Sequence, residues 1–446
     1  MVKRYDRLSE WGSEAATNEA GNKVITFDGL THVTWQDYVE EGYYNRVRTL
    51  DRGTGKWSET YTLDKARDNH ARGVITADSR GFLHVILSGH NTPCNYRCSI
   101  RPNDASEWTE PVEVASGTYP YLLCGPEDTL YLTLRNADRC DGVDFYSKES
   151  DGEWRFRCKV VAHDHKYTGY AAFAGGMCFD ASGVLHLVSD FFEGFGSWED
   201  RGVHQAVAYM HSADGGSTWR TWQHDPIEPP ARPHDMDVIA QSTGTRHEDT
   251  APPIMVAQGN IAVDSDGRPH VFYLYHLNEP GQLLLASPND EGVWREHAVD
   301  PCKTIYPAYR PMACRGAFTI GEDGVFRALV SLAPVDDPGW VNGLPVRNPG
   351  FARESGAPVV WLVSEDGGKN FSIEPLVEPD EHLRINTPKF ELAVGAGIRP
   401  AGAPDVLTFD SKRHRLPGIK DIQGIQNNVF WFPGDAYSRV HRGVGE

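Results

Sequence analysis

A short repeated unit constrains the fold of this chain more than any other feature. It reads Asp-x-x-Gly-x-x-His and leads into an apolar run with the length of a β-strand. Three clear copies and three weaker ones begin at or near Asp78, Asp180, Asp264, Asp28, Gly125 and Asp323. Early copies follow one another at about 50 residues, and the spacing lengthens after Asp180. Such a chain repeats one small β unit many times, so we expect an all-β fold.

A second recurring feature lies later in each unit, and it is a polar turn that ends in Trp or Phe. Its fullest version, residues 212–219, reads Ser-x-Asp-x-Gly-x-Thr-Trp and is an Asp-box. This turn joins outer strands and specifies no chemistry. Four short strands in each of six or seven units are typical of a β-propeller. The sequence therefore predicts a seven-bladed β-propeller.

We expect one propeller domain over residues 25–433, with an N-terminal segment (1–24) before it and a tail (434–446) after it. Ring closure is expected to pair residues 427–431 with N-terminal strands. An insertion in the fourth blade, near residues 222–253, is rich in His and Asp, but no two histidines have the spacing of metal ligands. We therefore predict a polar loop over one face there.

The net charge of −19 argues against two classes of partner. An acidic chain is poorly suited to bind nucleic acid or an anionic membrane, and no apolar run approaches the roughly 20 residues that span a bilayer. The eight cysteines are scattered, which favours buried free thiols over a zinc site. The first residues show no signal peptide, so we expect a cytoplasmic protein or a mature secreted form.

Four polar residues, called the quartet below, flank two successive predicted hairpins. His70 and His90 bracket one strand–turn–strand segment, and Tyr119 and Arg135 bracket the next. The two ends of a hairpin lie close together, so each pair should be adjacent in space. In a propeller blade the innermost strand begins, and the second strand ends, at the same face. The quartet is therefore expected on one face of two adjacent blades, as candidate catalytic residues.

Other residues at equivalent positions on that face are candidates for binding substrate. They are Tyr170, Arg310 and Arg315, and two further candidates, Trp198 and Arg201, lie in a long loop that leaves the same face. With the quartet they would form a cationic cleft within an acidic protein, able to hold an anionic sugar. The histidines of the repeat, at positions 84, 186 and 270, are expected to be structural and to bond the turn backbone.

The quartet fits β-elimination at a uronic acid better than glycoside hydrolysis. Hydrolysis uses two carboxylic acids that flank the bond, and no such pair accompanies the quartet. Elimination removes the proton on C5 and expels the oxygen on C4, while negative charge builds on the adjacent carboxylate. Arg135 with a histidine can neutralise that charge, and Tyr119 or a histidine can act as base and acid. The reaction needs no metal or organic cofactor.

With these residues the chain resembles the seven-bladed polysaccharide lyases with BNR-type repeats. These are the ulvan lyases and the related L-rhamnose-α-1,4-D-glucuronate lyase that acts on gum arabic. The resemblance covers about residues 25–430 and rests on the repeats and on the two pairs of the quartet. It implies Tyr119 as acid and base, Arg135 as the group that neutralises the uronate, and His70 and His90 as base or neutraliser. It also implies a uronate-containing polysaccharide as partner, and a structural calcium or zinc ion whose ligands the sequence does not place.

Two other functions stay open from the sequence. A sialidase-like hydrolase is consistent with the Asp-box and would need three arginines around a carboxylate, for which Arg135, Arg201 and Arg315 are available. It would also need a Tyr–Glu pair, and none is evident. A non-catalytic carbohydrate-binding propeller would use the same fold without turnover. Ultraviolet absorbance of an unsaturated product distinguishes elimination from both.

Overall fold

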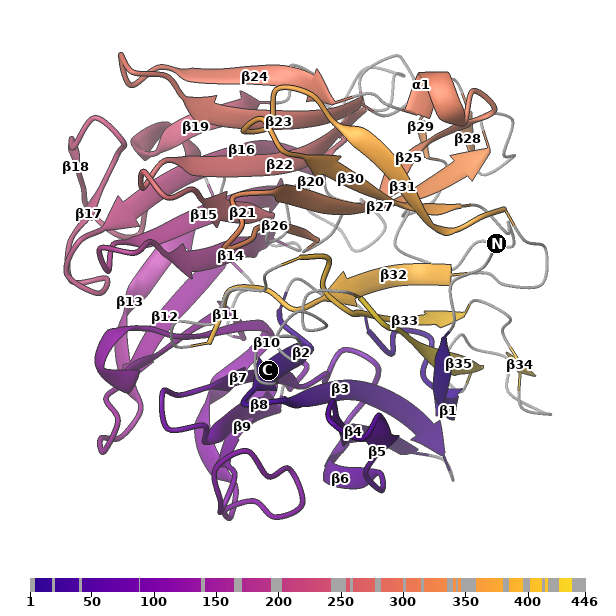
Figure 1. Ribbon diagram of the computed structural model, residues 1–446. Helices are drawn as coiled ribbons and strands as arrows, with labels where there is room; N and C mark the ends of the chain where they lie inside the picture. The colour runs from indigo at the N-terminus through magenta and orange to yellow at the C-terminus, as the bar shows by residue number, and fades with distance from the viewer. Residues whose placement is uncertain are drawn as a thin grey trace, which may run out of the picture.

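The protein is described by a computed structural model, in which the strands pair antiparallel (Figure 1). The structure describes residues 5–434, except for 18–20, 40–41, 88, 138–140, 164–170, 194–202, 242–253, 257–259, 277–281, 300–301, 314–316, 335–339, 342–343, 346–357, 380–384, 396–401, 411–413 and 416–424. The all-β class predicted from the sequence is confirmed. The described helical elements are one short helix and two 3-10 turns, namely α1 (Cys302–Ile305), η1 (Pro126–Asp128) and η2 (Pro233–Asp235). None of them is long and apolar enough to cross a membrane.

The repeated aspartate turns connect neighbouring strands in the way that their chemistry requires. One oxygen of Asp78 accepts the backbone N–H groups of Arg80 and Phe82, and Gly81 takes the left-handed conformation with φ +85°. The other oxygen of Asp78 lies 3.7 Å from Nε2 of His84. Asp180 and Asp264 repeat this arrangement with their own histidines. The repeat histidines are thus structural, but they contact the aspartate and not the turn backbone as predicted.

Two sheets contain the strands of residues 6–162 together with those of residues 385–432. The ten-stranded sheet consists of β32 (Ile385–Phe390), β33 (Val406–Asp410), β35 (Ile425–Phe432), β1 (Asp6–Gly12), β3 (Leu30–Val39), β4 (Gly42–Asp51) and β5 (Lys56–Trp57), with β2 (Val24–Phe27), β34 (His414–Arg415) and β6 (Tyr61–Ala66) paired at its sides. The seven-stranded sheet runs in the order β13 (Arg155–Ala162), β12 (Gly142–Lys148), β11 (Leu130–Asn136), β10 (Val112–Cys124), β9 (Thr92–Cys98), β8 (Leu83–Leu87) and β7 (Val74–Ala77).

The strands of residues 171–377 form three further sheets and a short ribbon. One sheet contains β14 (Ala171–Phe179), β15 (Leu185–Glu193), β16 (Val203–Ser212), β17 (Trp219–Arg220), β18 (Pro226–Ile227) and β19 (Asp237–Gln241). The next contains β20 (Ile254–Val256), β21 (Ile261–Val263), β22 (Pro269–His276), β23 (Gln282–Pro288) and β24 (Trp294–Val299). The last contains β25 (Tyr309–Ala313), β26 (Phe318–Ile320), β27 (Phe326–Pro334), β30 (Val359–Ser364) and β31 (Ser372–Val377), and the ribbon is β28 (Trp340–Val341) with β29 (Leu344–Pro345).

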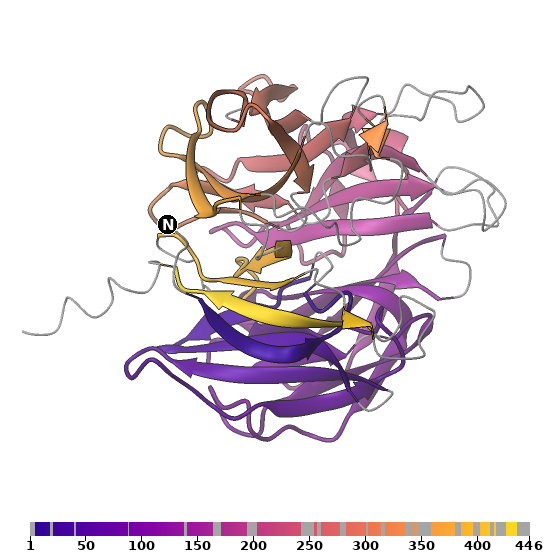
Figure 2. The same cartoon turned by 90° about the vertical axis from the view of Figure 1, so that its right-hand side faces the viewer.

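The two ends of the chain meet in one sheet, as the sequence predicts. Strand β1 pairs with β35 through Asp6↔Trp431 and Arg7↔Phe430, and the first and last strands lie side by side in Figures 1 and 2. Strand β1 falls within the predicted N-terminal segment 1–24, so this part of the segment belongs to the sheet. The domain boundaries at 25 and 433 otherwise stay predictions.

The insertion predicted near 222–253 is described up to residue 241. Its strand β19 pairs with β16 through Ala206↔Gln241 and Tyr209↔Asp237, and β18 pairs with β17. This part therefore extends a sheet and is not the loop over one face that we predicted. The open backbone groups of β16 provide the reason, because an unpaired strand edge favours another strand. Residues 242–253 lie outside the described residues.

Large aromatic side chains join neighbouring sheets. Phe145 of β12 packs edge-on against Trp219 of β17 at 5.7 Å between ring centroids, and Trp361 of β30 packs against Phe390 of β32 at 5.1 Å. Burial of such rings supplies much of the apolar stabilisation of the fold. Trp219 ends the Asp-box, where Asp214 accepts Oγ–H of Ser212 and N–H of Thr218, so the box is structural as predicted.

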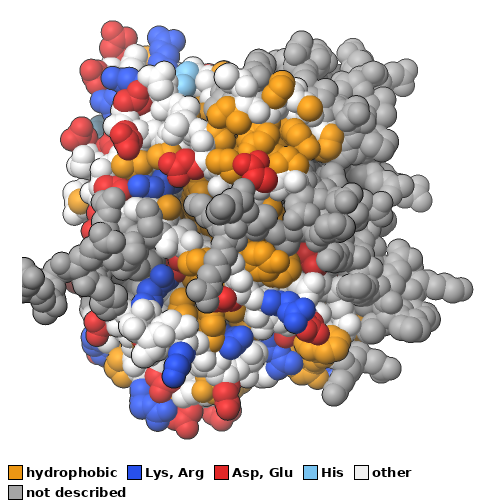
Figure 3. Space-filling view, turned by 45° about the vertical axis from the view of Figure 1, so that its right-hand side comes forward, with side chains coloured by type: hydrophobic (Ala, Val, Ile, Leu, Met, Phe, Trp, Pro, Cys, Tyr) orange, Lys and Arg blue, Asp and Glu red, His pale blue; other side chains and the backbone are white. Residues whose placement is uncertain are grey.

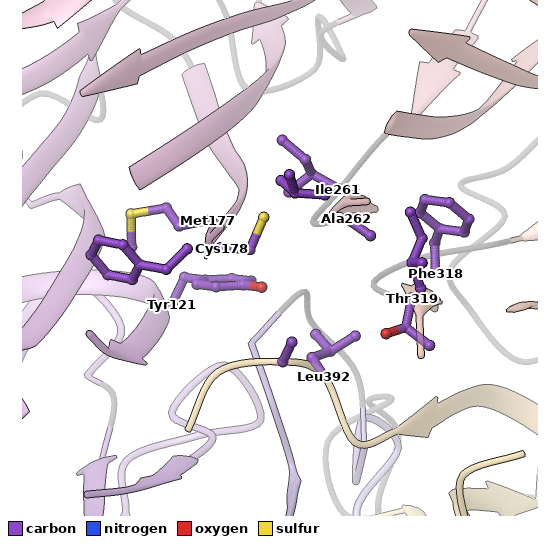
Figure 4. Close-up of a pocket in the computed structure, with 12 residues that line it drawn as sticks. Tyr121, Met177, Cys178, Ile261, Ala262, Phe318, Thr319 and Leu392 are labelled. Carbon is purple, nitrogen blue, oxygen red and sulfur yellow. The ribbon is translucent and has the colours of Figure 1, made fainter. Parts of the chain in front are cut away.

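The first strands of neighbouring sheets contact one another, and β14, β21 and β26 lie near the middle of the molecule (Figure 1). A small cavity of about 20 Å³ lies there, between Tyr121 of β10, Met177 and Cys178 of β14, and residues of β21 and β26 (Figure 4). Its lining is mainly apolar and contains no member of the quartet. Five cysteines, at positions 94, 98, 124, 158 and 178, are free thiols, in line with the sequence. On the face drawn in Figure 3, side chains of both charge signs are interspersed among apolar ones.

Candidate active site

His70 and His90 lie next to each other at one end of the first hairpin. His70 precedes β7 and His90 follows β8, and the register Val74↔Ile86 brings the two ends together. The two imidazole rings stack with centroids 4.1 Å apart and planes inclined by 23°. Their side chains are 29% and 30% exposed, so each ring has one edge accessible to a ligand. The predicted neighbourhood of these two residues is confirmed.

Asp68 binds both histidines from the turn between β6 and β7. Its Oδ2 lies 2.7 Å from Nδ1 of His90, and its Oδ1 accepts the backbone N–H of His70 at 2.8 Å. The distance from Oδ1 to Nδ1 of His70 is 3.5 Å, which is an ion-pair distance and not a hydrogen bond. The carboxylate therefore fixes the His90 ring by its Nδ1 edge and the His70 residue by its backbone N–H. Sequence reasoning missed Asp68, because a polar residue in a turn is ordinarily a structural one.

Tyr119 lies at an irregular point of β10. The first part of this strand pairs with β9 and the last part with β11, and the register with β11 shifts between Thr118 and Tyr121. Tyr119 has φ +59°, a left-handed conformation that is uncommon for a bulky residue. Backbone strain of this kind persists where surrounding structure enforces it, often at functional sites. The bulge turns the Tyr119 ring toward His70, at 6.4 Å between centroids.

Arg135 completes the quartet from β11, opposite Thr118 in the register. Its Cζ lies 4.6 Å from the centroid of the Tyr119 ring, in a cation–π contact, and its side chain is fully buried. The structure places the guanidinium behind the Tyr119 ring, and the predicted adjacency of Tyr119 and Arg135 is confirmed.

Asn91 links the two hairpins and is a second residue that sequence reasoning missed. Its Oδ1 accepts hydrogen bonds from the guanidinium of Arg135 at 3.0 Å and from the hydroxyl of Thr118 at 3.1 Å. Its own N–H donates to Oγ1 of Thr118 at 2.9 Å. Asn91 has φ +53°, a conformation that asparagine tolerates better than most residues. Asn91 directly follows His90 in the sequence, and this position is the feature by which it could have been identified as a site residue.

The charges around the histidines favour one ionised carboxylate and one neutral ring. Burial alone would raise the pKa of Asp68, but hydrogen bonds from His70 and His90 hold that pKa well below its ordinary value. Burial lowers the pKa of His70, and the positive charges of Arg72 and His90 lower it further against the effect of Asp68. Asp68 is therefore an anion at neutral pH, and a proton on His70 is disfavoured.

A buried glutamate lies behind this cluster. Glu14 accepts a hydrogen bond from the hydroxyl of Tyr43 at 3.2 Å, and burial raises the pKa of Glu14 to about 7 in spite of that bond and the charge of Arg72. The guanidinium of Arg72 is itself buried and donates to the carbonyl of Ala15. Arg72 lies near both Glu14 and His70, because its positive charge lowers the pKa of each.

The predicted substrate-binding residues are mostly not placed by the structure. Tyr170, Trp198, Arg201 and Arg315 lie outside the described residues. Arg310 lies at the start of β25, opposite Ala333, and is only 4% exposed. Its role as a substrate contact stays a prediction.

The structural ion implied by the resemblance would need ligands that converge on one point. Among the described residues, Asp68, His70 and His90 have ligand atoms within 4.8 Å of one another. A zinc ion lies in the plane of each imidazole ligand, at roughly 2 Å from the nitrogen. The stacked rings have nearly parallel planes, so their lone pairs do not meet. This group does not fit such an ion, and the position of the ion stays a prediction.

Comparison with known proteins shows which protein family this chain is related to. The BNR repeat-containing family matches residues 32–301, which is more than half of the chain. The chain belongs to this family. Two similar proteins are the ulvan lyase (PL25) of Pseudoalteromonas sp. (strain PLSV), 22% identical and covering 91% of this chain and 84% of that protein, and an ulvan lyase of Alteromonas sp. (strain LOR), 21% identical and covering 85% and 80%.

Solved structures agree with this relationship. A PL25 ulvan lyase superposes on 95% of this chain and 95% of that chain, with a TM-score of 0.67 and 16% identity. The polysaccharide lyase Uly1 covers 97% of this chain and 99% of that chain, with a TM-score of 0.61 and 11% identity. At these identities the likeness shows a shared fold. The predicted relationship to the ulvan lyase group is confirmed over nearly the full chain.

Proposed function

We propose that this protein is a polysaccharide lyase that cleaves a rhamnosyl–uronate linkage by β-elimination, with glucuronate at the cleavage site. The observation that carries the proposal is the grouping of His70, His90, Tyr119 and Arg135, since this set supplies every role that elimination requires. Relationship to ulvan lyases supports the reaction class. A PL25 ulvan lyase has been solved with -[GlcA(1-4)Rha3S]- bound, which supports a glucuronate–rhamnose substrate.

The chemistry of the cluster favours elimination over hydrolysis. A glycosidase needs a protonated carboxylic acid beside the scissile oxygen and a second carboxylate nearby. Among the described residues, Asp68 is the carboxylate seen in contact with the quartet, and both of its oxygens are engaged by the histidines. Its low pKa makes it an anion that cannot donate a proton. Its function is then to hold imidazoles in place.

In the proposed reaction, a base takes the proton on C5 and the C4–O bond breaks, which leaves a C4=C5 double bond. The leaving oxygen receives a proton, so the reaction consumes no water and involves no oxidation. The exposed edges of His70 and His90 face the uronate and stabilise negative charge on its carboxylate as C5 loses its proton. Tyr119 transfers the proton from C5 and then to the leaving oxygen.

Arg135 is proposed to act from behind Tyr119. A positive charge next to a phenol favours its phenolate form, which is the stronger base. Full burial of the Arg135 side chain supports this role more than direct contact with the substrate. The hydrogen bonds that Arg135 and Thr118 donate to Asn91 hold this arrangement in the absence of substrate.

We infer that the fold has seven blades. The first strands of successive units contact one another in the order β2, β7, β10, β14, β21 and β26. Residues near β32 return to the start, where Glu391 accepts the N–H of Thr26 and Val394 accepts the hydroxyl of Thr76. With β32 as the seventh strand, the ring is complete.

A structural calcium or zinc ion, if bound, would use ligands other than the Asp68 cluster.

The deciding experiment is a screen of uronate polysaccharides, ulvan and gum arabic first, followed by ultraviolet absorbance of the unsaturated product. We expect signal on at least one substrate and its loss in His90→Ala and Arg135→Ala. New reducing ends without absorbance would indicate a hydrolase, and binding without turnover would indicate a carbohydrate-binding propeller. Full rates in both variants would refute the site.

A further inference from the structure

Asp68 offers two oxygens to two histidines but holds them unequally. Its Oδ2 is at hydrogen-bond distance from Nδ1 of His90, 2.7 Å, whereas its Oδ1 is 3.5 Å from Nδ1 of His70 and is occupied by the backbone N–H of that residue. His90 therefore has a charged partner for a proton on Nδ1. In His70 the Nδ1 atom is buried and makes no hydrogen bond.

The stacking of the rings limits how many protons they carry. Two positive imidazolium rings with centroids 4.1 Å apart repel each other, so the second proton is disfavoured once the first is bound. One carboxylate compensates one positive charge. The arrangement thus favours one imidazolium beside one neutral imidazole.

The groups that face the rings decide which histidine holds the proton. Asp68 and Arg72 come from the turn before β7, Tyr119 comes from β10, and Arg135 lies behind Tyr119. The positive charge of Arg72 acts against a proton on His70, and burial acts in the same direction. The close carboxylate stabilises a proton on His90.

We propose that Asp68 is a positioning residue that divides the work of the two histidines, so that His90 is the imidazolium that neutralises the uronate carboxylate and His70 is the neutral imidazole. The catalytic role given to each histidine rests on the proposed function. The assignment of the proton to His90 rests on the geometry around Asp68. It names the neutralising histidine, which neither the sequence nor the family resemblance decides. Because both Nδ1 edges face Asp68, the Nε2 edges are the ones offered to the sugar.

The assignment predicts an order of titration in the unmodified protein. NMR of the full chain, with ring signals assigned through His70→Gln and His90→Gln, should show His90 losing its proton at higher pH than His70. The reverse order would overturn the proposal. This measurement needs no substrate and no activity, so it distinguishes failure of this inference from failure of the lyase proposal.

Asp68→Asn provides the second test, since it keeps the shape and removes the charge. The titration of His90 should move to lower pH by about one unit or more. The alkaline limb of kcat/KM on the uronate polysaccharide should move with it, so the loss is about tenfold or more at pH 8 and smaller near pH 6. Asp68→Glu, which restores a carboxylate, should recover part of both. A uniform loss at every pH, with His90 titrating as before, would mean that Asp68 is merely structural.

Asp264→Asn is a matched control. Asp264 also holds a histidine, His270, at 2.9 Å, but in a repeat turn. This variant should lose stability and keep the pH profile of the wild type. A shift of the alkaline limb in Asp264→Asn as large as that in Asp68→Asn would overturn the assignment.

Discussion

The guanidinium of Arg135 lies 4.6 Å from the centre of the Tyr119 ring and has no exposed surface. A buried cation against an aromatic face is held in one geometry and is shielded from water, so its charge acts strongly on the phenol. The same contact sets Tyr119 at a fixed distance from His70. Tyr119 and Arg135 thus behave as one unit that the second hairpin presents.

Arg135→Lys should lower activity through kcat more than through KM. Lysine keeps the charge but loses the planar group that stacks on Tyr119 and bonds Asn91. We expect kcat to fall about tenfold or more, with KM within a few-fold of the wild type. Initial rates of product absorbance over a range of substrate concentrations measure both. A raised KM with unchanged kcat would instead indicate that Arg135 contacts the substrate.

Tyr119→Phe should separate the phenol's chemistry from its packing. Phenylalanine keeps the ring over Arg135 and loses only the hydroxyl, and both residues bear the same strain at φ +59°. The rate should drop by roughly a hundredfold or more, as for loss of a general acid or base. Thermal unfolding should change little. If Tyr119→Phe keeps its activity, the proton transfer must be assigned to His70 instead of Tyr119.

Asn91→Gly should show what the link between the hairpins contributes. Glycine accepts φ +53° without strain, so the substitution removes the side chain alone. Two hydrogen bonds are lost, and we expect a loss in unfolding free energy of about 1–3 kcal/mol together with lower kcat. Asn91→Ala adds backbone strain and should be less stable still. Equal stability of the two variants would contradict the role of the left-handed conformation.

Glu14→Gln should raise stability at alkaline pH. The pKa of Glu14 is about 7 in the folded protein and lies near 4.5 when the group is exposed, so folding favours its protonated form. Its favourable contribution is present below pH 4.5 and is lost as pH rises through 7. Glutamine should therefore stabilise the protein by an amount on the order of 2–3 kcal/mol at pH 8 and by little at pH 4.

Denaturant unfolding at these two pH values measures the effect of Glu14→Gln. Glu10→Gln is a suitable control, because Glu10 is about half exposed in a surface pair with Arg7. It should show no comparable dependence on pH. A Glu14→Gln protein that is no more stable at pH 8 than the wild type would show that Glu14 is ionised without penalty.

The sequence predicted the quartet because hairpin geometry is local. His70 and His90, or Tyr119 and Arg135, are brought together by a turn whose Asp and Gly residues can be identified from sequence. Asp68 and Asn91 could not be found in this way. The role of Asn91 depends on contacts between the two hairpins, and that of Asp68 on contacts with both ends of the first hairpin. Each looks like an ordinary turn residue in the sequence. The burial of Arg135 also depends on the neighbouring Tyr119 bulge, which no sequence pattern marks.

The pairing of β1 with β35 joins the outermost segments of the chain within one sheet. Strands β7 to β13, which carry the quartet or flank it, form a contiguous piece of sequence and need no such distant partner. We therefore expect the catalytic hairpins to assemble early during folding. The pairing of β1 with β35 should form last, because it closes the longest loop and costs the most chain entropy. Removal of β1 or β35 would leave the backbone N–H and C=O groups of its partner strand unpaired, and a second molecule could pair with that exposed edge.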